Sequence, residues 1–464
     1  MFFNTFDYAV FLPVVLGLYW WIPRGARIPL LLVASYVFYG WWDARFLALI
    51  AISTLVDFMV ARRLAVAESP RGRRRLLSIS IVANLGFLGF FKYWGFFIDS
   101  AAELMSRLGL EAHPPVLRIL LPAGISFYTF QALSYTIDVY RRRIEPEPSL
   151  LRFALFISFF PHLVAGPIMR ASQLLAQFRN LPDHPRQVRW KDGVALIGLG
   201  LFRKVVFADG VAPFVDRVFS NPSLFDRSTL FFAALGFAIQ IYGDFAGYSD
   251  IARGTARLFG VELVENFRQP YLATSVTDFW RRWHMSLSTW LREYLYISLG
   301  GNRHGRLRTF RNLMLTMLLG GLWHGANWTF VLWGGLHGLY LSAERLLRVD
   351  HPGPRWPVFG RVWTFGLVGV AWILFRSSSF ADAADYLGGL IAGSGTETAV
   401  GGPLLVVMLG GLMILLDVIQ AANPFEELVA SLHPALRGAA YGAAAVAMVV
   451  LSSSVSIPFI YFRF

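Results

Sequence analysis

Long apolar runs separated by short, arginine-rich loops recur along most of this 464-residue chain. This arrangement is typical of a protein that crosses a lipid bilayer many times. The composition agrees, because 56% of the residues are hydrophobic and only 15% are charged, well below the ~25% of soluble proteins. The sequence therefore predicts an all-α polytopic membrane protein with one domain over residues 1–464, rather than two or three soluble domains.

The apolar runs predict where the chain crosses the membrane. The N-terminal run lacks the basic region and the small-residue cleavage site of a signal peptide, so we interpret it as the first spanning helix. Several runs are shorter than the ~20 residues of an ideal span, and we expect about 11 transmembrane helices with additional re-entrant and interfacial helices. The further runs are 28–42, 46–61, 76–98, 119–140, 193–208, 229–246, 310–323, 327–346, 360–376, 403–420 and 438–452.

Three other segments do not read as simple spans. Residues 150–169 are apolar, but Pro161 and Pro167 interrupt them. Broken backbone at membrane depth is tolerated only where it is packed in protein or lines a cavity, so we expect one of these two environments here. Residues 171–192 and 378–399 are more polar and predict interfacial connections.

The loop arginines predict the orientation. With the N-terminus outside, the inner loops up to residue 143 carry far more arginines than the outer loops, as the positive-inside rule requires. The outer loops hold Arg45, Arg107 and Arg118. The inner loops hold Arg24, Arg27, Arg62, Arg63, Arg71, Arg73, Arg74, Arg75, Arg141, Arg142 and Arg143.

Composition and motifs exclude several classes of protein. The chain has no cysteine, which excludes disulfides, thiolate nucleophiles and cysteine–zinc sites. Its net charge of +13 is concentrated between apolar runs, so it reflects membrane topology rather than a nucleic-acid surface. The motifs of zinc peptidases, serine hydrolases, P-loop proteins and soluble His-x4-Asp acyltransferases are absent. We find no inverted repeat, which weakens a transporter interpretation.

The strongest candidate site lies at the end of the apolar run 310–323, where His324 stands between a tryptophan and a glycine. If a helix enters the bilayer at Arg311, His324 lies roughly 20 Å further along it, in a hydrocarbon core about 30 Å thick. An ionisable group at that depth is costly and predicts function. A neutral histidine in a dry site suits a general base, and Asn327 is a candidate to orient its imidazole.

A second candidate is the stretch 280–296, which we predict to be one amphipathic helix. One face would carry Trp283 with other aromatic side chains, and the opposite face would carry Arg281, His284, Ser288 and Arg292. Two interpretations stay open. The helix is either a plain interfacial helix with snorkelling arginines, or a cationic mouth that attracts a phosphate-bearing donor.

A third candidate is the segment 241–260, where Asp244 and Tyr248 follow an apolar run. Asp244 is either an acidic helix residue paired to an arginine or a carboxylate that holds a histidine in one tautomer. His337, within the run 327–346, stays ambiguous between a core residue and a site residue.

Several of these motifs resemble one known family. RRWHMSLSTWLREYLYISLGGNR and GGLWHGANW are similar to blocks of the bacterial membrane-bound O-acyltransferases, in the branch of the alginate O-acetyltransferases and the teichoic-acid D-alanyl transfer protein. Further similarities are ASYVFYGWWD, LPAGISFYTFQALSYTIDVYR, FFPHLVAGPIMR and YGDFAGYSDIARG. The core motifs fall within 121–346, and residues 360–464 carry little signal.

The resemblance implies a ring of helices around a central tunnel, in which a cytoplasmic funnel and an extracellular cavity meet near the catalytic histidine. The family's W-H-G histidine matches His324, and an upstream position, His or Asn in the family, matches His284. Ser298 and Glu293 depart from the usual residues but touch neither histidine position. The expected location is the cytoplasmic (inner) membrane of a bacterium, with the N-terminus outside.

The expected activity is transfer of an acyl group, most simply acetyl, from a cytoplasmic thioester on coenzyme A or an acyl carrier protein. The donor would enter past Arg281, Arg282 and Trp283, His324 would activate a hydroxyl, and His284 or Asn327 would stabilise the oxyanion. A periplasmic or secreted partner would then acylate a polysaccharide such as alginate, or a cell-wall polymer. We expect no metal and no bound cofactor. The alternatives are a lipid, protein or teichoic-acid acceptor, or a proton-coupled transporter that uses the buried histidines.

Overall fold

A computed structural model describes residues 1–110, 117, 119–347, 357–393, 395–423, 425–452 and 458–460 of the protein. Arg118, used above for the orientation, lies outside them. Apart from an isolated β-bridge between Phe225 and Glu397, the described residues form helices and their connections. The chain divides into an N-terminal unit, Met1–Gly193 with Thr255–Val264, and a C-terminal unit, Val194–Gly254 with Glu265–Phe464.

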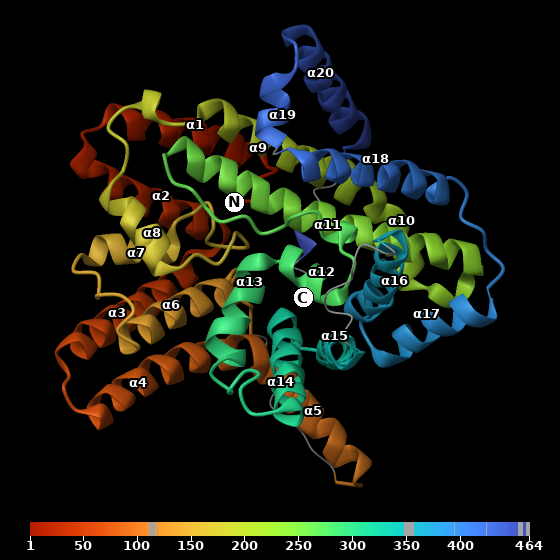
Figure 1. Ribbon diagram of the computed structural model, residues 1–464, viewed down its shortest axis with the longest axis horizontal. Coiled ribbons are helices and arrows are strands. Elements are labelled where there is room, and N and C mark those ends of the chain that lie inside the picture. Colours follow the sequence, from red (N-terminus) through yellow and green to blue (C-terminus); the bar gives the residue numbers. More distant parts are fainter. Residues whose placement is uncertain are drawn as a thin grey trace. The chain divides into compact units, whose positions relative to one another are not determined.

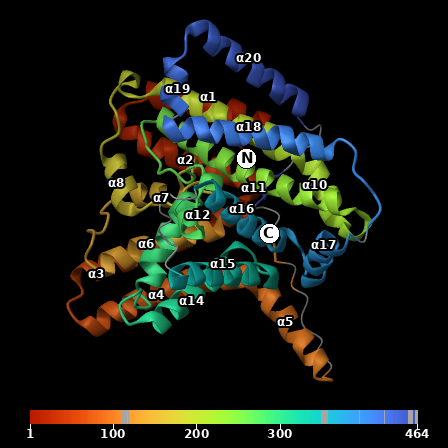
Figure 2. The ribbon, with the colours of Figure 1, turned by 45° about the vertical axis from the view of Figure 1, so that its right-hand side comes forward.

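The N-terminal unit holds these helices: α1 Phe6–Trp21, α2 Arg24–Asp43, η1 Ala44–Phe46, α3 Leu47–Val66, α4 Pro70–Leu88, η2 Gly89–Tyr93, α5 Trp94–Arg107, α6 Ile125–Tyr140, α7 Leu150–Ser158, α8 Ala171–Arg179 and η3 Pro185–Gln187. Helices α3, α4 and α6 lie side by side (Figures 1 and 2). A buried carboxylate joins them, since Asp57 of α3 accepts hydrogen bonds from Ser80 and Asn84 of α4 and from Thr136 of α6. Shared donors of this kind offset the cost of burying a charge in an apolar helix bundle.

The predicted break in 150–169 is confirmed. Helix α7 ends at Ser158, and residues 160–165 form turns. The segment is packed in protein, since residues 153–169 are all buried. At its centre the Nε2 atom of His162 lies 3.0 Å from the Oε1 atom of Gln131.

The C-terminal unit holds the remaining helices: α9 Trp190–Phe202, η4 Arg203–Asp209, α10 Gly210–Ser220, η5 Pro222–Leu224, α11 Arg227–Leu258, η6 Pro270–Leu272, α12 Val276–Arg282, α13 Met285–Trp290, η7 Leu291–Tyr296, α14 Arg306–His324, α15 Trp328–Leu347, α16 Pro357–Arg376, α17 Phe380–Ala392, α18 Gly402–Ala422, α19 Phe425–Ser431 and α20 Pro434–Leu451. The first residues of α9 and the last turn of α11 belong to the N-terminal unit. Every later apolar run of the sequence coincides with a helix, and 378–399 contains α17.

Six segments of the described chain are long and apolar enough to cross a membrane, and the protein is a multi-pass membrane protein. The longest, Arg24–Val66, holds both α2 and α3. The others are Pro70–Arg107, Arg227–Leu258, Pro357–Arg376, Gly402–Ala422 and Pro434–Leu451. The N-terminal helix Phe6–Trp21 is apolar but shorter.

Helices α14 and α15 form a close-packed hairpin, seen side by side in Figure 2. Glycines set the spacing between the two backbones. A Cβ atom at Gly321 would lie 2.2 Å from the carbonyl oxygen of Phe330, and one at Gly334 would lie 2.1 Å from that of Met317. Only glycine permits so close an approach. The hairpin therefore fixes where α14 ends, and α14 ends on His324.

Candidate active site

His324 lies in an aromatic box in the C-terminal unit. Its side chain is nearly inaccessible, with a relative exposure of 3%. The ring centroids of Trp323, Trp333 and Phe375 lie 5.0, 5.1 and 5.5 Å from that of His324. Each of the three rings packs against the imidazole in a T-shaped, edge-to-face geometry. The next residue is Gly325, where a Cβ atom would lie 2.2 Å from the ring of Phe330. The site is thus dry and closely packed, which suits a histidine that must remain neutral until it takes a proton.

His284 is the second histidine of the site, with its ring centroid 6.2 Å from that of His324. It is fully buried, and its ring packs edge-to-face with the ring of Phe245, with the two centroids 4.6 Å apart. Burial lowers the pKa of His284 to about 3, so its imidazole is neutral at physiological pH. The structure therefore brings together the two histidines that the sequence singled out.

The backbone around His284 corrects the prediction of one continuous helix over 280–296. Helix α12 ends at Arg282, and His284 has a left-handed conformation, with φ of 42°. Asn266 holds this break, because its backbone oxygen accepts from the N–H of Met285 and its side chain accepts from Ser286. A short α13 follows, and the π-helix η7 completes the stretch. The predicted basic and aromatic faces therefore do not run along one helix.

The break separates Trp283 from the arginines that precede it. Trp283 is fully buried and packs against Trp372, with a centroid separation of 5.0 Å, so it belongs to the wall of the site rather than to an exposed mouth. Ser288 donates to the carbonyl oxygen of Trp283 at 3.1 Å. Arg281 is exposed, whereas Arg282 pairs with Asp278 at 2.9 Å.

Asp244 holds none of the histidines that the structure describes. Its carboxylate pairs with the Nζ atom of Lys204 at 2.8 Å and accepts from the backbone N–H of Ile460 at 2.5 Å. The sequence offered an arginine as the alternative partner of Asp244. The partner is a lysine, so the ion pair was predicted but the residue that forms it was not. The neighbouring Tyr248 packs its ring against Phe459, with centroids 4.8 Å apart. Both residues therefore anchor the segment 458–460.

Asn327 does not orient the imidazole of His324 either. Its amide nitrogen donates to the carbonyl oxygen of Ser378 at 2.8 Å, and its amide oxygen accepts from the backbone N–H of Thr329 at 3.0 Å. The second contact satisfies one of the free N–H groups at the start of α15. Asn327 is therefore a helix cap beside the site.

His337, which the sequence left ambiguous, belongs to the same aromatic cluster as His324. It is fully buried, and Trp280 donates from Nε1 to its Nδ1 atom at 3.2 Å. Because Nδ1 accepts, the neutral ring carries its proton on Nε2. The ring of Trp333 lies between the two histidines, 5.1 Å from His324 and 4.9 Å from His337. Only its position within an apolar run hinted at this placement.

Chemically, the arrangement offers two buried imidazoles in a water-poor aromatic box. One can act as a proton acceptor and the other as a hydrogen-bond donor to a developing negative charge. Among the described residues, no three histidine, aspartate or glutamate side chains cluster as metal ligands do.

Comparisons with known proteins point in one direction. The membrane-bound O-acyltransferase (MBOAT) family matches residues 141–350, which include both histidines. A probable alginate O-acetylase of Azotobacter vinelandii is 46% identical over 373 residues, covering 80% of this chain and 74% of the relative. A peptidoglycan O-acetyltransferase of Helicobacter pylori is 35% identical over 434 residues, covering 85% of this chain and 80% of the relative. A teichoic acid D-alanyltransferase of Streptococcus thermophilus is 28% identical over 264 residues, covering 53% of this chain and 63% of the relative.

Proposed function

Since the chain belongs to the membrane-bound O-acyltransferase family and is an enzyme of that kind, we propose that it moves an acetyl group from a cytoplasmic thioester to a polysaccharide outside the cell. The observation that carries the proposal is the pair of buried imidazoles, His284 and His324, with centroids 6.2 Å apart. Similarity to alginate and peptidoglycan O-acetylating relatives supports the choice of an acetyl group and a polysaccharide acceptor.

The chemistry assigns one role to each histidine. His324 accepts the proton of the attacking hydroxyl while the hydroxyl oxygen bonds to the thioester carbonyl carbon. His284, neutral because it is buried, donates its N–H to the oxyanion of the tetrahedral intermediate. The carbon–sulfur bond then breaks, and the thiolate takes the proton from His324 to leave as a thiol. Neither step needs a metal ion.

The donor is coenzyme A or an acyl carrier protein, both of which carry phosphate. Arg281 suits a phosphate contact because it is exposed and forms no ion pair within the described chain. Arg282 contributes less, since Asp278 already neutralises it. We place the enzyme in the cytoplasmic membrane of a bacterium with its N-terminus outside, where a periplasmic or secreted partner receives the acetyl group.

A second candidate keeps the site and changes the group and acceptor. The similarity to a teichoic acid D-alanyltransferase favours D-alanyl transfer to teichoic acid over transfer to a lipid or protein. The lower identity and coverage of that relative make acetyl transfer to polysaccharide the first choice. The transporter alternative is set aside, because the chain is a member of an acyltransferase family.

The test is thioester consumption by the purified protein in liposomes, with acetyl group labelled on coenzyme A and, in parallel, on acyl carrier protein. The variants are His324→Gln and His284→Gln, which keep side-chain volume close to that of the wild type. His184→Gln, at an exposed position, is the matched control. We expect wild type and control to release free thiol, and both site variants to lose at least a hundredfold in rate at unchanged thermal stability. D-alanyl thioester, consumed faster than acetyl thioester, would favour the second candidate.

A further inference from the structure

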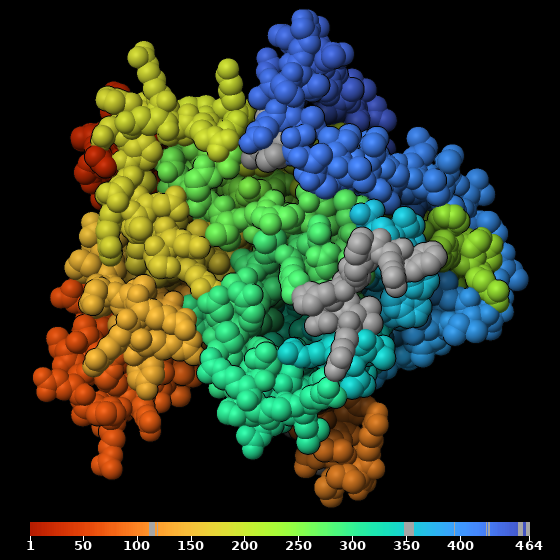
Figure 3. Space-filling model, in the orientation of Figure 1, coloured from red at the N-terminus to blue at the C-terminus, as the bar shows by residue number. Residues whose placement is uncertain are grey.

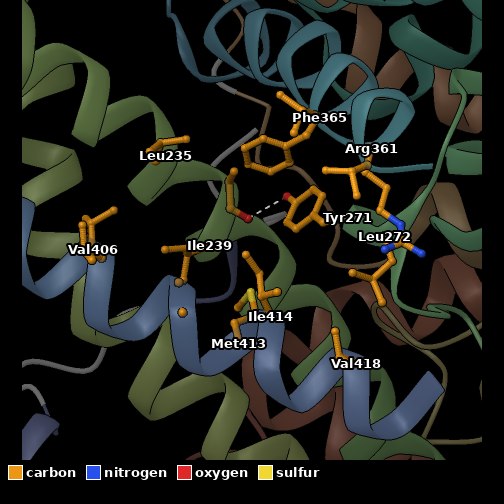
Figure 4. Close-up of a pocket in the computed structure, with 16 residues that line it drawn as sticks. Leu235, Ile239, Tyr271, Leu272, Arg361, Phe365, Val406, Met413, Ile414 and Val418 are labelled. Atoms are coloured by element: carbon orange, nitrogen blue, oxygen red, sulfur yellow. Dashed lines mark hydrogen bonds between the residues drawn. The ribbon is translucent and has the colours of Figure 1, made fainter. Parts of the chain in front are cut away.

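An apolar groove of about 500 Å³ opens on the C-terminal unit between α11, α16 and α18 (Figure 4). Ile239 of α11, Phe365 of α16 and Met413 of α18 contribute to its walls. The hydroxyl of Tyr271, one of its lining residues, donates to the carbonyl oxygen of Ala238 at 2.7 Å. The lining therefore offers an occupant mainly hydrocarbon contacts.

The three helices that form the groove are also three of the segments able to cross a membrane. The groove therefore opens where lipid, rather than water, surrounds the protein. Helix α18, drawn in blue, lies at the surface in Figure 3, and its side chains Val407, Ile414 and Val418 are exposed apolar members of the lining. Apolar surface of this kind is stable only against another apolar phase.

One charged residue stands in this lining. Arg361 lies in the second turn of α16, is exposed, and forms no ion pair with any residue that the structure describes. Figure 4 places it beside Tyr271 and Leu272, at the opposite side of the groove from Val406. A guanidinium group pairs well with phosphate, because its planar donors match the phosphate oxygens.

We propose that the groove is a binding site for a membrane phospholipid, with one acyl chain between α16 and α18 and its phosphate on Arg361. Apolar walls, the membrane setting and a single cation at one side together match a molecule with a hydrocarbon tail and an anionic head. The occupant would also support the active site, since Tyr271 of the groove wall contacts Trp283, with centroids 6.4 Å apart. Trp283 in turn precedes His284.

Gly411 gives a direct test, because it lines the groove and an added Cβ atom there meets nothing within 4 Å. Gly411→Phe therefore fills the groove without a clash at its Cβ atom. Gly366→Phe is the matched control, since Gly366 has the same open space on α16 but does not line the groove. Arg361→Gln removes the charge and keeps the hydrogen-bonding side chain.

The measurement is native mass spectrometry of the full-length purified protein in detergent, titrated with phosphatidylglycerol. We expect wild type and Gly366→Phe to hold one tightly bound lipid, Gly411→Phe to bind at least tenfold more weakly, and Arg361→Gln to show intermediate weakening. Inorganic phosphate at equal concentration should not displace the lipid, because the acyl chain holds it. Binding by Gly411→Phe equal to wild type would overturn the proposal. Unchanged binding by Arg361→Gln would overturn the proposed contact between Arg361 and the lipid phosphate.

Discussion

The hairpin of α14 and α15 makes the position of His324 depend on a glycine that touches neither histidine. In Gly334→Ala, the new Cβ atom would lie 2.1 Å from the carbonyl oxygen of Met317. An ordinary carbon–oxygen contact is about 3.3–3.6 Å, so the two backbones must separate by roughly 1.2–1.5 Å at this point. Overpacking of this kind costs about 1–3 kcal/mol, partly offset by the ~1 kcal/mol better helix propensity of alanine.

The separation should reach the site. Met317 lies seven residues before His324, or roughly 10 Å along the helix, and the equally close contact at Gly321 stands between them. A displacement of about 1 Å at a catalytic group can cost 10²-fold in rate. We therefore expect Gly334→Ala to lower acyl transfer roughly 100-fold, while the melting temperature falls by only a few degrees.

Gly335→Ala is the matched control, one residue further along the same helix. Its Cβ atom would meet only the tip of the flexible Leu318 side chain, at 3.2 Å. The assay is thiol release from acetyl-coenzyme A in liposomes, paired with thermal unfolding followed by tryptophan fluorescence. If Gly334→Ala transfers acetyl groups as fast as Gly335→Ala, or if both lose activity equally, the close contact at Gly334 does not position His324.

Three further outcomes follow from contacts in the structure. Asn327→Ala should cost about 1 kcal/mol of stability, seen in thermal unfolding, because a helix cap is lost, with the rate of the folded enzyme little changed. Asp244→Asn should keep acyl transfer within a few-fold of wild type, whereas a tautomer-holding role would make it nearly inactive. Although desolvation opposes it, hydrogen bonding by Arg179 holds the pKa of Glu147 below its ordinary value. The ionised Glu147 therefore stabilises the fold above the unfolded-state pKa, and this stabilisation is lost as the pH falls through the lower folded-state pKa. In Glu147→Gln, the free energy of unfolding should therefore fall less steeply with decreasing pH in an acid denaturation experiment.

Much of the helical architecture could be predicted from the sequence, because hydropathy reports on burial in lipid one residue at a time. The run 310–323 became most of α14, and the prolines of 150–169 marked a true break. His324 could be found for the same reason, since an ionisable residue that ends a long apolar helix stands out in a single sequence. The orientation of the N-terminus and the total of about 11 spans remain predictions.

The contacts that complete the site could not be predicted, because they join residues far apart in the chain. The left-handed turn at His284 depends on Asn266, which lies 18 positions earlier and has no regular spacing to it. The partner of Asp244 is Lys204, 40 positions away on the π-helix η4. Helical periodicity assumes an unbroken helix, so it placed Trp283 and His284 on two faces of one helix, whereas α12 ends at Arg282, before both residues.

In the proposed mechanism, His324 is the base that activates the acceptor hydroxyl. The most direct measurement is the single-turnover rate of acetyl transfer from acetyl-coenzyme A in liposomes, for wild type, His324→Gln and the exposed control His184→Gln. We expect His324→Gln to bind the donor with unchanged affinity but to transfer its acetyl group at least a hundredfold more slowly, while the control matches wild type. A folded His324→Gln protein with the wild-type rate would show that His324 is not the base.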